Sequence, residues 1–216
     1  NQYQSFDGMV LTDTFQLYEQ GSDMIANLLP DNSERRTKQK NRNIKVIVGN
    51  PPYSVHSRTT YPKLDKSYSD KIIAQSAAKH KSGLNDPFYK AIFWAATKLG
   101  EEGVVAYVVN NSWIESLIAD GFRNFLLESF SSIYLVDLKG DVRKAQFDKD
   151  NLSEGENVFG NNSQNGIVIA IFVRKKGIKL PANIKYINIG NNLKTSEKLN
   201  KLQSFSSIKK IDNSKY

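Results

Sequence analysis

The sequence contains no cysteine, so neither a disulfide nor a thiolate metal site is available to it. Its two histidines, His56 and His80, lie in polar stretches without the close spacing that a zinc or non-haem iron site needs. We therefore expect no metal-dependent chemistry. The longest apolar runs, at residues 103–109 and 167–173, are far shorter than the roughly 20 residues that span a bilayer, and no signal-peptide pattern opens the sequence. These features predict a soluble, cytoplasmic protein.

Acidic residues are scarce relative to basic ones. The 216 residues include 30 Lys and Arg against 22 Asp and Glu, which gives a formal net charge of +8. This balance favours an acidic partner, nucleic acid first, although charge alone indicates only non-specific attraction. A chain of this length can form one ordinary domain whose core needs no covalent or metal staple.

Short runs rich in Val and Ile, bounded by turn residues, predict buried strands. These runs lie at residues 9–12, 44–48, 104–109, 133–138 and 167–174. Helical spacing of apolar residues predicts helices at 87–99 and 120–129, with Asp120 as the N-cap of the second. Because parallel neighbours need a crossover between them, strands that alternate with helices predict an α/β fold with a mostly parallel sheet.

Polar stretches at residues 34–45, 54–85 and 141–164 are predicted to be surface loops. The last forty residues or so lose the strand signal and become rich in Lys, Asn and Ser, which predicts a boundary near Gly177. Residues 1–177 would then form the main unit, and 178–216 a linker or the start of another region. Because the chain begins at Asn1 and reaches an apolar run within ten residues, we interpret it as a fragment.

The segment from Ile47 to Tyr53 carries the clearest chemical signal, because a buried strand runs directly into Asn50, Pro51 and Pro52. Two consecutive prolines stiffen the loop and donate no backbone hydrogen bond. The loop follows the carboxyl end of a strand, where α/β sheets place their ligands. The Asn50 amide oxygen and the Pro51 carbonyl can accept both hydrogens of an exocyclic amine, and Tyr53 offers a flat face to its ring.

This segment resembles motif four of the amino-methyltransferases. The stretches at residues 86–92 and 103–113 resemble the helix and strand that follow this motif in adenine-specific DNA methyltransferases of the gamma arrangement. The stretch Leu11-Thr12-Asp13-Thr14-Phe15 resembles their acidic motif three, and Asn157-Val158-Phe159-Gly160 resembles their motif eight. The resemblance covers about residues 8–175 and implies a partial Rossmann-like fold that uses S-adenosylmethionine and lacks its N-terminal strands.

The resemblance also implies a role for each matching residue. Asn50, Pro51, Pro52 and Tyr53 would be catalytic, and Tyr53 would stack on a flipped adenine together with Phe159. The cofactor would be contacted by Asp13, Phe15, Phe88 and Tyr89. No metal is implied.

The opening from Phe6 to Leu17 resembles a narrower group, the large restriction-modification enzymes that fuse a helicase-like motor to such a methyltransferase. This implies double-stranded DNA as a partner, and an upstream cofactor-binding half with helicase or nuclease domains in the same polypeptide, but no membrane. The glycine-rich loop that holds the methionine part of the cofactor does not occur in the sequence. Residues 1–177 would thus be the catalytic half of the domain, with an incomplete cofactor site and no activity in isolation, and 178–216 would be a linker or lead into target recognition.

Three other amine substrates fit the same motif: cytosine N4, a guanine amine in RNA and a glutamine side chain of a protein. Phe159 favours a base over glutamine, since glutamine needs no second stacking aromatic, and the +8 charge favours nucleic acid. Asn rather than Ser before the prolines favours adenine over cytosine. A function of another class, a non-catalytic DNA-binding or assembly module, also fits the isolated chain.

Overall fold

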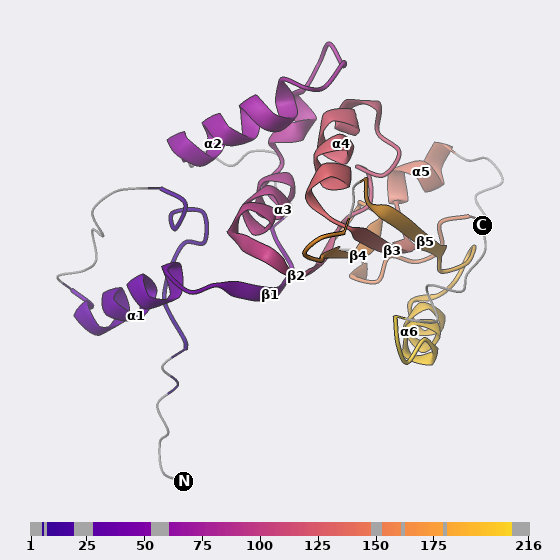
Figure 1. Cartoon of the computed structure of the whole chain (residues 1–216). Helices are drawn as coiled ribbons and strands as arrows, with labels where there is room; N and C mark the ends of the chain where they lie inside the picture. The colour runs from indigo at the N-terminus through magenta and orange to yellow at the C-terminus, as the bar shows by residue number, and fades with distance from the viewer. Residues whose placement is uncertain are drawn as a thin grey trace, which may run out of the picture.

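A central β-sheet organises the chain in the computed structural model (Figure 1), which describes residues 6, 8–19, 28–52, 61–147, 153–160, 163–178 and 181–208. The sheet has five strands in the order β1-β2-β4-β3-β5. Their bounds are β1 (Ile44–Gly49), β2 (Leu99–Asn110), β3 (Ser132–Lys139), β4 (Ile167–Arg174) and β5 (Asn183–Asn188). The four strands expected at residues 44–48, 104–109, 133–138 and 167–174 are therefore present.

Strand direction divides the sheet unevenly. Strands β1 and β2 pair in parallel, as do β3 and β5, whereas β4 lies antiparallel between β2 and β3. All strands other than β4 consequently point the same way, which confirms the predicted α/β class and its mostly parallel strand direction. The carboxyl ends of β1, β2 and β3 meet at one edge of the sheet, together with the start of β4.

Helices α3 (Pro87–Lys98) and α4 (Asp120–Ser129) cover one face of the sheet, close to their predicted bounds. Pro87 occupies the first turn of α3, and the Asp86 carboxylate accepts a hydrogen bond from the Phe88 backbone N–H at 3.3 Å. Between these helices and the sheet lies a core of aromatic side chains, of which Phe122, Phe130 and Phe172 are fully buried. Packing of the helices on this sheet face thus buries aromatic side chains together with aliphatic ones.

Asp120 differs from its prediction, because Ala119 occupies the N-cap of α4 and no side chain caps this helix. The Asp120 carboxylate instead accepts hydrogen bonds from the backbone N–H groups of Ala77 at 2.8 Å and Gly121 at 2.8 Å. Hydrogen bonds from Ser76 and Ala77 lower the pKa of Asp120 to about 2. This carboxylate therefore ties α4 to the segment that follows α2.

The opposite face of the sheet is covered by α6 (Thr195–Ser204). Side chains alternate along β3, so Ile133 and Leu135 join the aromatic core while Val136 and Leu138 face the other way. The second cluster packs against Leu202 and Phe205, at the end of α6. Since β5 pairs with β3, the boundary predicted near residue 177 falls between two strands of one sheet, and the roles assigned to its two sides remain predictions.

Residues 9–12 form no strand, contrary to the prediction. The Leu11 backbone N–H donates to the Asn32 Oδ1 at 2.7 Å, and the Asn32 Nδ2 donates to the Leu11 carbonyl at 2.9 Å. This side-chain amide, which belongs to α1 (Pro30–Lys40), satisfies the backbone groups that a neighbouring strand would otherwise pair. Met9 and Leu11 are 67% and 65% exposed, so the apolar run does not reach the core.

Several helices lie in stretches that were predicted to be loops. They are α1 in the stretch 34–45, α2 (Pro62–Tyr68), the π-helix η1 (Ser69–Ile73) and the 3-10 helix η2 (Ser82–Asn85) in 54–85, and α5 (Val142–Phe147) in 141–164. For α2 the Glu19 carboxylate accepts hydrogen bonds from the N–H groups of Lys63 and Leu64 at 3.0 and 2.9 Å. A cap supplied from more than 40 residues away leaves no local sequence signal.

Gly121 allows α4 to approach η1 and the segment after it closely, so this residue tests the packing of α4. An added Cβ at residue 121 would lie 2.5 Å from the Ile72 carbonyl oxygen and 2.9 Å from the Ser76 nitrogen. Because backbone atoms cannot move aside, Gly121→Ala should reduce the free energy of unfolding by about 1–3 kcal/mol, measured by urea denaturation. At Gly83 the added Cβ would meet only the flexible Ile118 Cδ1, so Gly83→Ala is the matched control. Equal stability losses in the two variants would contradict this explanation.

Candidate active site

A cavity of about 580 Å³ opens at the carboxyl end of β1, on the sheet face that carries α3. Two sequence segments that were expected to form the site meet there, one with Asp13 and Phe15 and one with Asn50, Pro51 and Pro52. The remaining lining residues are Thr14, Ile47, Val48, Gly49, Tyr61, Pro87, Ala91, Trp94 and Tyr107. Aromatic rings, prolines and one carboxylate therefore surround the cavity, a composition that suits a flat ligand with a polar edge.

The loop after β1 presents Asn50 at the mouth of this cavity. Pro51 is buried, whereas Asn50 and Pro52 are exposed, so the first proline anchors the loop. Gly49 pairs with Tyr107 of β2, and an added Cβ at residue 49 would lie 3.2 Å from the Tyr107 ring. Burial raises the pKa of Tyr107 to about 12, so its phenol is neutral at physiological pH. The strand pair thus fixes the base of the loop against a neutral aromatic wall.

Asp13 also lines the cavity and is oriented by three donors. The Tyr61 hydroxyl donates to its Oδ2 at 2.6 Å, and the backbone N–H groups of Phe15 and Gln16 donate to its Oδ1 at 2.9 and 3.5 Å. The rings of Phe15 and Tyr61 meet edge to face with centroids 5.3 Å apart. Charge-assisted hydrogen bonds of this kind fix a carboxylate without using all its lone pairs, so Asp13 can still accept from a ligand amine.

The structure does not place Phe88 and Tyr89 in this cavity. Their side chains are only 1% and 3% exposed, and the two rings stack in the core with centroids 4.1 Å apart. The same helix lines the cavity with Pro87, Ala91 and Trp94 instead. These positions recur at helical spacing of four and three residues, which is the sequence signal that identifies this face of α3. Tyr61 was also missed, because it lies within the polar stretch 54–85, which was predicted to be a surface loop.

The other two predicted site residues cannot be assigned to the cavity. Tyr53 lies outside the described residues, as does His56. Phe159 is described; it is 41% exposed on the segment 153–160 and does not line the cavity. The structure therefore brings Asp13, Phe15 and the Asn-Pro-Pro loop together, and leaves Phe159 on a separate segment that precedes β4.

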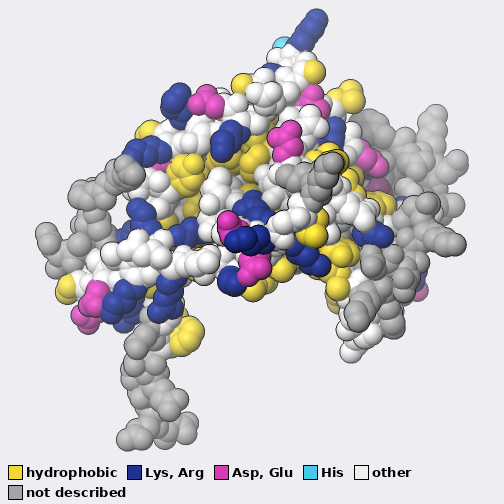
Figure 2. Space-filling model, in the orientation of Figure 1, with side chains coloured by type: hydrophobic (Ala, Val, Ile, Leu, Met, Phe, Trp, Pro, Cys, Tyr) yellow, Lys and Arg dark blue, Asp and Glu magenta, His cyan; other side chains and the backbone are white. Residues whose placement is uncertain are grey.

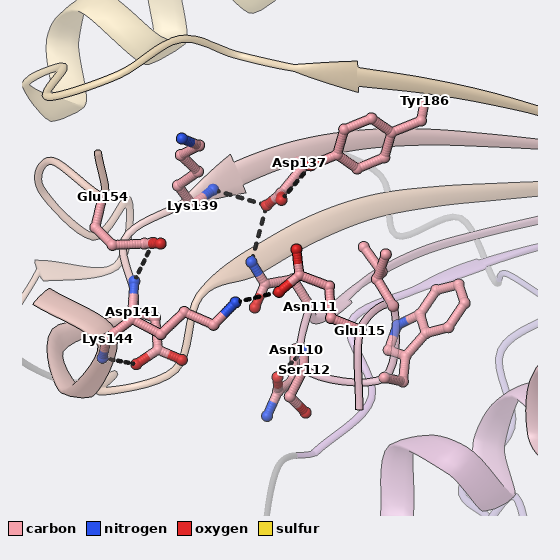
Figure 3. Close-up of polar contacts among 12 residues, drawn as sticks. Asn110, Asn111, Ser112, Glu115, Asp137, Lys139, Asp141, Lys144, Glu154 and Tyr186 are labelled. Atoms are coloured by element: carbon pink, nitrogen blue, oxygen red, sulfur yellow. Dashed lines mark hydrogen bonds and ion pairs between the residues drawn. The ribbon is translucent and has the colours of Figure 1, made fainter. Parts of the chain in front are cut away.

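A polar network holds the ends of β2, β3 and β5 together at the same sheet edge (Figure 3). The buried Asp137 accepts hydrogen bonds from the Asn111 Nδ2 at 2.9 Å, the Lys139 backbone N–H at 2.9 Å and the Tyr186 hydroxyl at 2.8 Å. An unpaired buried carboxylate would destabilise the fold, so these three donors are required to stay within hydrogen-bonding distance of Asp137. The network gives the loops that leave this edge a rigid base.

The segment that carries Phe159 is attached to this edge through Asn157, which is also buried. The Asn157 Nδ2 donates to the carbonyls of Gly140 at 2.9 Å and Asn165 at 2.8 Å, and its Oδ1 accepts from the Phe159 N–H at 2.9 Å. An added Cβ at Gly140, whose φ is +84°, would lie 2.7 Å from the Asn157 Cα. One amide thus fixes the ends of β3 and β4 relative to the exposed aromatic.

The described part of the chain holds neither a candidate metal site nor a candidate membrane span. It contains no group of three or more His, Cys, Asp or Glu side chains that could hold a metal ion. It also contains no helix that is both long enough and apolar enough to cross a membrane.

The α/β sheet agrees with the methyltransferase class that the sequence resemblance indicated, and the comparison with known families identifies this class. Residues 6–144 match the family of Eco57I restriction-modification methylases. The chain belongs to this family. A search of curated proteins returned no match.

Solved structures agree with this assignment. The chain is 36% identical to a chain of the ATP-dependent Type ISP restriction-modification enzyme LlaBIII bound to DNA, over 98% of this chain and 15% of that one, with a TM-score of 0.91. It is 32% identical to a nuclease-deletion mutant of the Type ISP enzyme LlaGI in complex with a DNA substrate mimic, over 97% and 17%, with a TM-score of 0.89. The corresponding values for the DrdV–DNA complex are 28%, 94%, 20% and 0.82. The resemblance to fused restriction-modification enzymes is confirmed, and the chain spans only 15–20% of these relatives' length.

Tyr61 tests the expectation that Asp13 contacts the cofactor. In the full-length polypeptide, Tyr61→Phe removes the hydroxyl that orients Asp13 and should weaken S-adenosylmethionine binding about tenfold, measured by calorimetry. Tyr68→Phe is the control, because the Tyr68 hydroxyl donates to the Leu84 carbonyl in the core at 2.6 Å and Tyr68 does not line the cavity. Unchanged affinity in Tyr61→Phe would separate Asp13 from cofactor binding.

Proposed function

We propose that this chain is part of a DNA methyltransferase that transfers a methyl group from S-adenosylmethionine to the N6 amine of a flipped adenine, within a fused restriction-modification polypeptide. The observation that carries the proposal is the shared cavity of Asp13 and the Asn50-Pro51-Pro52 loop. Asp13 can accept a hydrogen bond from the amine of one ring, and the Asn50 loop can accept from the amine of another. Their place on one cavity suits a reaction between two ring-bearing molecules.

The residues on the Asp13 side fit the adenosine part of S-adenosylmethionine. Asp13 retains lone pairs for an exocyclic amine, and Phe15, Pro87 and Trp94 offer apolar surfaces to a flat ring. When bound, the cofactor supplies an electrophilic methyl group. We propose that the residues that hold its methionine part come from elsewhere in the polypeptide, so the 216-residue chain alone would neither bind it appreciably nor methylate DNA.

Asn50 and Pro51 activate the target amine in this proposal. The lone pair of an adenine amine is delocalised into the ring, which makes the nitrogen a poor nucleophile. When the Asn50 amide oxygen and the Pro51 carbonyl accept both N–H groups, they hold the nitrogen toward tetrahedral geometry and direct its lone pair at the methyl group. Positioning and preorganised acceptors supply most of the acceleration, without a covalent intermediate.

The target base must leave the duplex to reach Asn50, at a cost of a few kcal/mol. Tyr53 and Phe159 would recover part of this cost by stacking on the base. Two observations support this role. The Phe159 side chain is 41% exposed and so is accessible to a ligand, and its backbone N–H donates to the buried Asn157 amide.

Charge and the comparisons support double-stranded DNA as the substrate. Basic side chains gather around α1 (Figure 2), where Arg35, Arg36, Lys38 and Lys40 accompany Asp31 and Glu34. When basic side chains contact phosphates, bound counterions are released, which favours nucleic acid as the partner.

The comparisons also support further domains. The LlaBIII enzyme is ATP-dependent and DNA-bound, and the LlaGI protein is a nuclease-deletion mutant, so we propose motor and nuclease domains in the same polypeptide here.

Asn50 provides the direct test. In the full-length enzyme, Asn50→Ala should lower turnover by two to three orders of magnitude, about 3–4 kcal/mol, with little change in DNA affinity. Asn124→Ala, exposed on α4 and outside the cavity, is the control. Nucleoside analysis of the product distinguishes N6-methyladenine from N4-methylcytosine. Near wild-type turnover in Asn50→Ala would remove this residue from the mechanism.

Phe159 tests the stacking role. Phe159→Ala should raise the activation free energy of single-turnover methylation by about 1–3 kcal/mol, because one stacking surface is lost. Tyr53→Ala should raise it by a similar amount, whereas Tyr53→Trp should retain activity. The matched control is Leu199→Ala, which also removes an exposed apolar side chain, 52% exposed on α6. Wild-type rates in both alanine variants would exclude the stacking pocket.

A further inference from the structure

Lys198 is a lysine of α6 with no exposed surface. Its Nζ donates to the Glu154 carbonyl at 3.0 Å and to the Glu156 carbonyl at 2.5 Å. An ammonium group is rarely buried unless its hydrogen bonds compensate for the lost water. Both bonded acceptors belong to the segment 153–160, so the position of this buried charge depends on the position of that segment.

Other contacts join the same two segments. The Glu156 N–H donates to the Leu193 carbonyl at 3.0 Å, and the Glu156 Oε2 accepts from the Thr195 N–H at 2.8 Å. The Thr195 hydroxyl donates to the Asn157 carbonyl at 3.2 Å. Since the Asn157 Oδ1 accepts from the Phe159 N–H, a continuous set of hydrogen bonds leads from the start of α6 to Phe159.

Another lysine, Lys201, lies three residues further along α6, and its role is limited to docking the helix on the sheet. The Lys201 Nζ donates to the Ile189 carbonyl, next to the end of β5, at 2.9 Å. Lys201 is exposed, so its bond holds the helix to the sheet without a buried charge. The same helix therefore contains one lysine bonded to the end of the sheet and one bonded to the segment that carries Phe159.

We propose that Lys198 is a positioning residue for methyl transfer, which holds segment 153–160 where Phe159 can stack on the target base. This inference rests on the proposed function, because it requires Phe159 to contact the base. It assigns to residues 193–198 the task of supporting the target-base side of the site.

A double-mutant cycle in the full-length polypeptide tests the proposal. Lys198→Met removes the donor while keeping an unbranched chain, and should lower the single-turnover methylation rate about tenfold, with S-adenosylmethionine affinity unchanged within about twofold. In the Phe159→Ala background, the same substitution should lower the rate by less than about twofold, because the aromatic through which it acts is gone. Lys201→Met should retain the wild-type rate within about twofold.

Three results would overturn the inference. The first is the same rate loss from Lys198→Met in both backgrounds, which indicates an effect independent of Phe159. The second is an equal loss in Lys201→Met, which indicates general docking of α6. The third is a wild-type rate in Phe159→Ala, which removes the stacking role in the proposed function as well; the first two leave that function intact.

A milder variant guards against loss of folding. If Lys198→Met lowers the unfolding temperature below that of the assay, Thr195→Val replaces it, because it removes only the hydroxyl bond to the Asn157 carbonyl at a partly buried site. Thr195→Val should lower the single-turnover rate about threefold alone and by no further factor with Phe159→Ala. Additive losses, or a wild-type rate in Thr195→Val, would contradict the proposal.

Discussion

The pairing of β4 between β2 and β3 is the constraint on which the site depends. Because β4 runs antiparallel to both neighbours, its first residue, Ile167, lies opposite Asn110 of β2 and Lys139 of β3. The segment that precedes β4 is thereby brought to the same sheet edge as the Asn50 loop, about one hundred residues earlier in the sequence. A parallel strand in this position would begin at the other edge and remove Phe159 from the side of the sheet where the cavity lies.

Polar side chains convert this topology into fixed geometry. Asp137 joins β2, β3 and β5, while Asn157 joins the ends of β3 and β4 to the segment with Phe159. Each is a buried side chain with several partners, so moving any one strand end would leave a buried polar group unpaired. The apolar core stabilises the sheet, but these two side chains determine how the loops leave it.

The sequence predicted the parts of the structure that depend on local patterns. The strands around Ile47 and Ile169 and the helices α3 and α4 have strong apolar periodicity, and the Asn50 motif carries its own geometry. Prediction failed where distant partners decide the structure: Glu19 caps α2, and the Asn32 amide replaces a strand neighbour for Leu11. The adjacent aromatics Phe88 and Tyr89 were assigned to the cofactor, whereas helical rotation turns both into the core. The roles of Asn50, Tyr53 and Phe159 remain predictions.

The outer edge of β1 has a consequence for how the chain behaves in solution. Among the described residues, β1 pairs only with β2, and its Val46 and Val48 side chains are 64% and 74% exposed. An open strand edge with apolar side chains is a template for intermolecular pairing. Charge protects this strand edge only weakly, because the Lys45 ammonium group is already paired with the Glu102 carboxylate at 2.5 Å and repels other chains little. Wherever this edge of β1 is left uncovered, the sheet would therefore promote aggregation through one short strand.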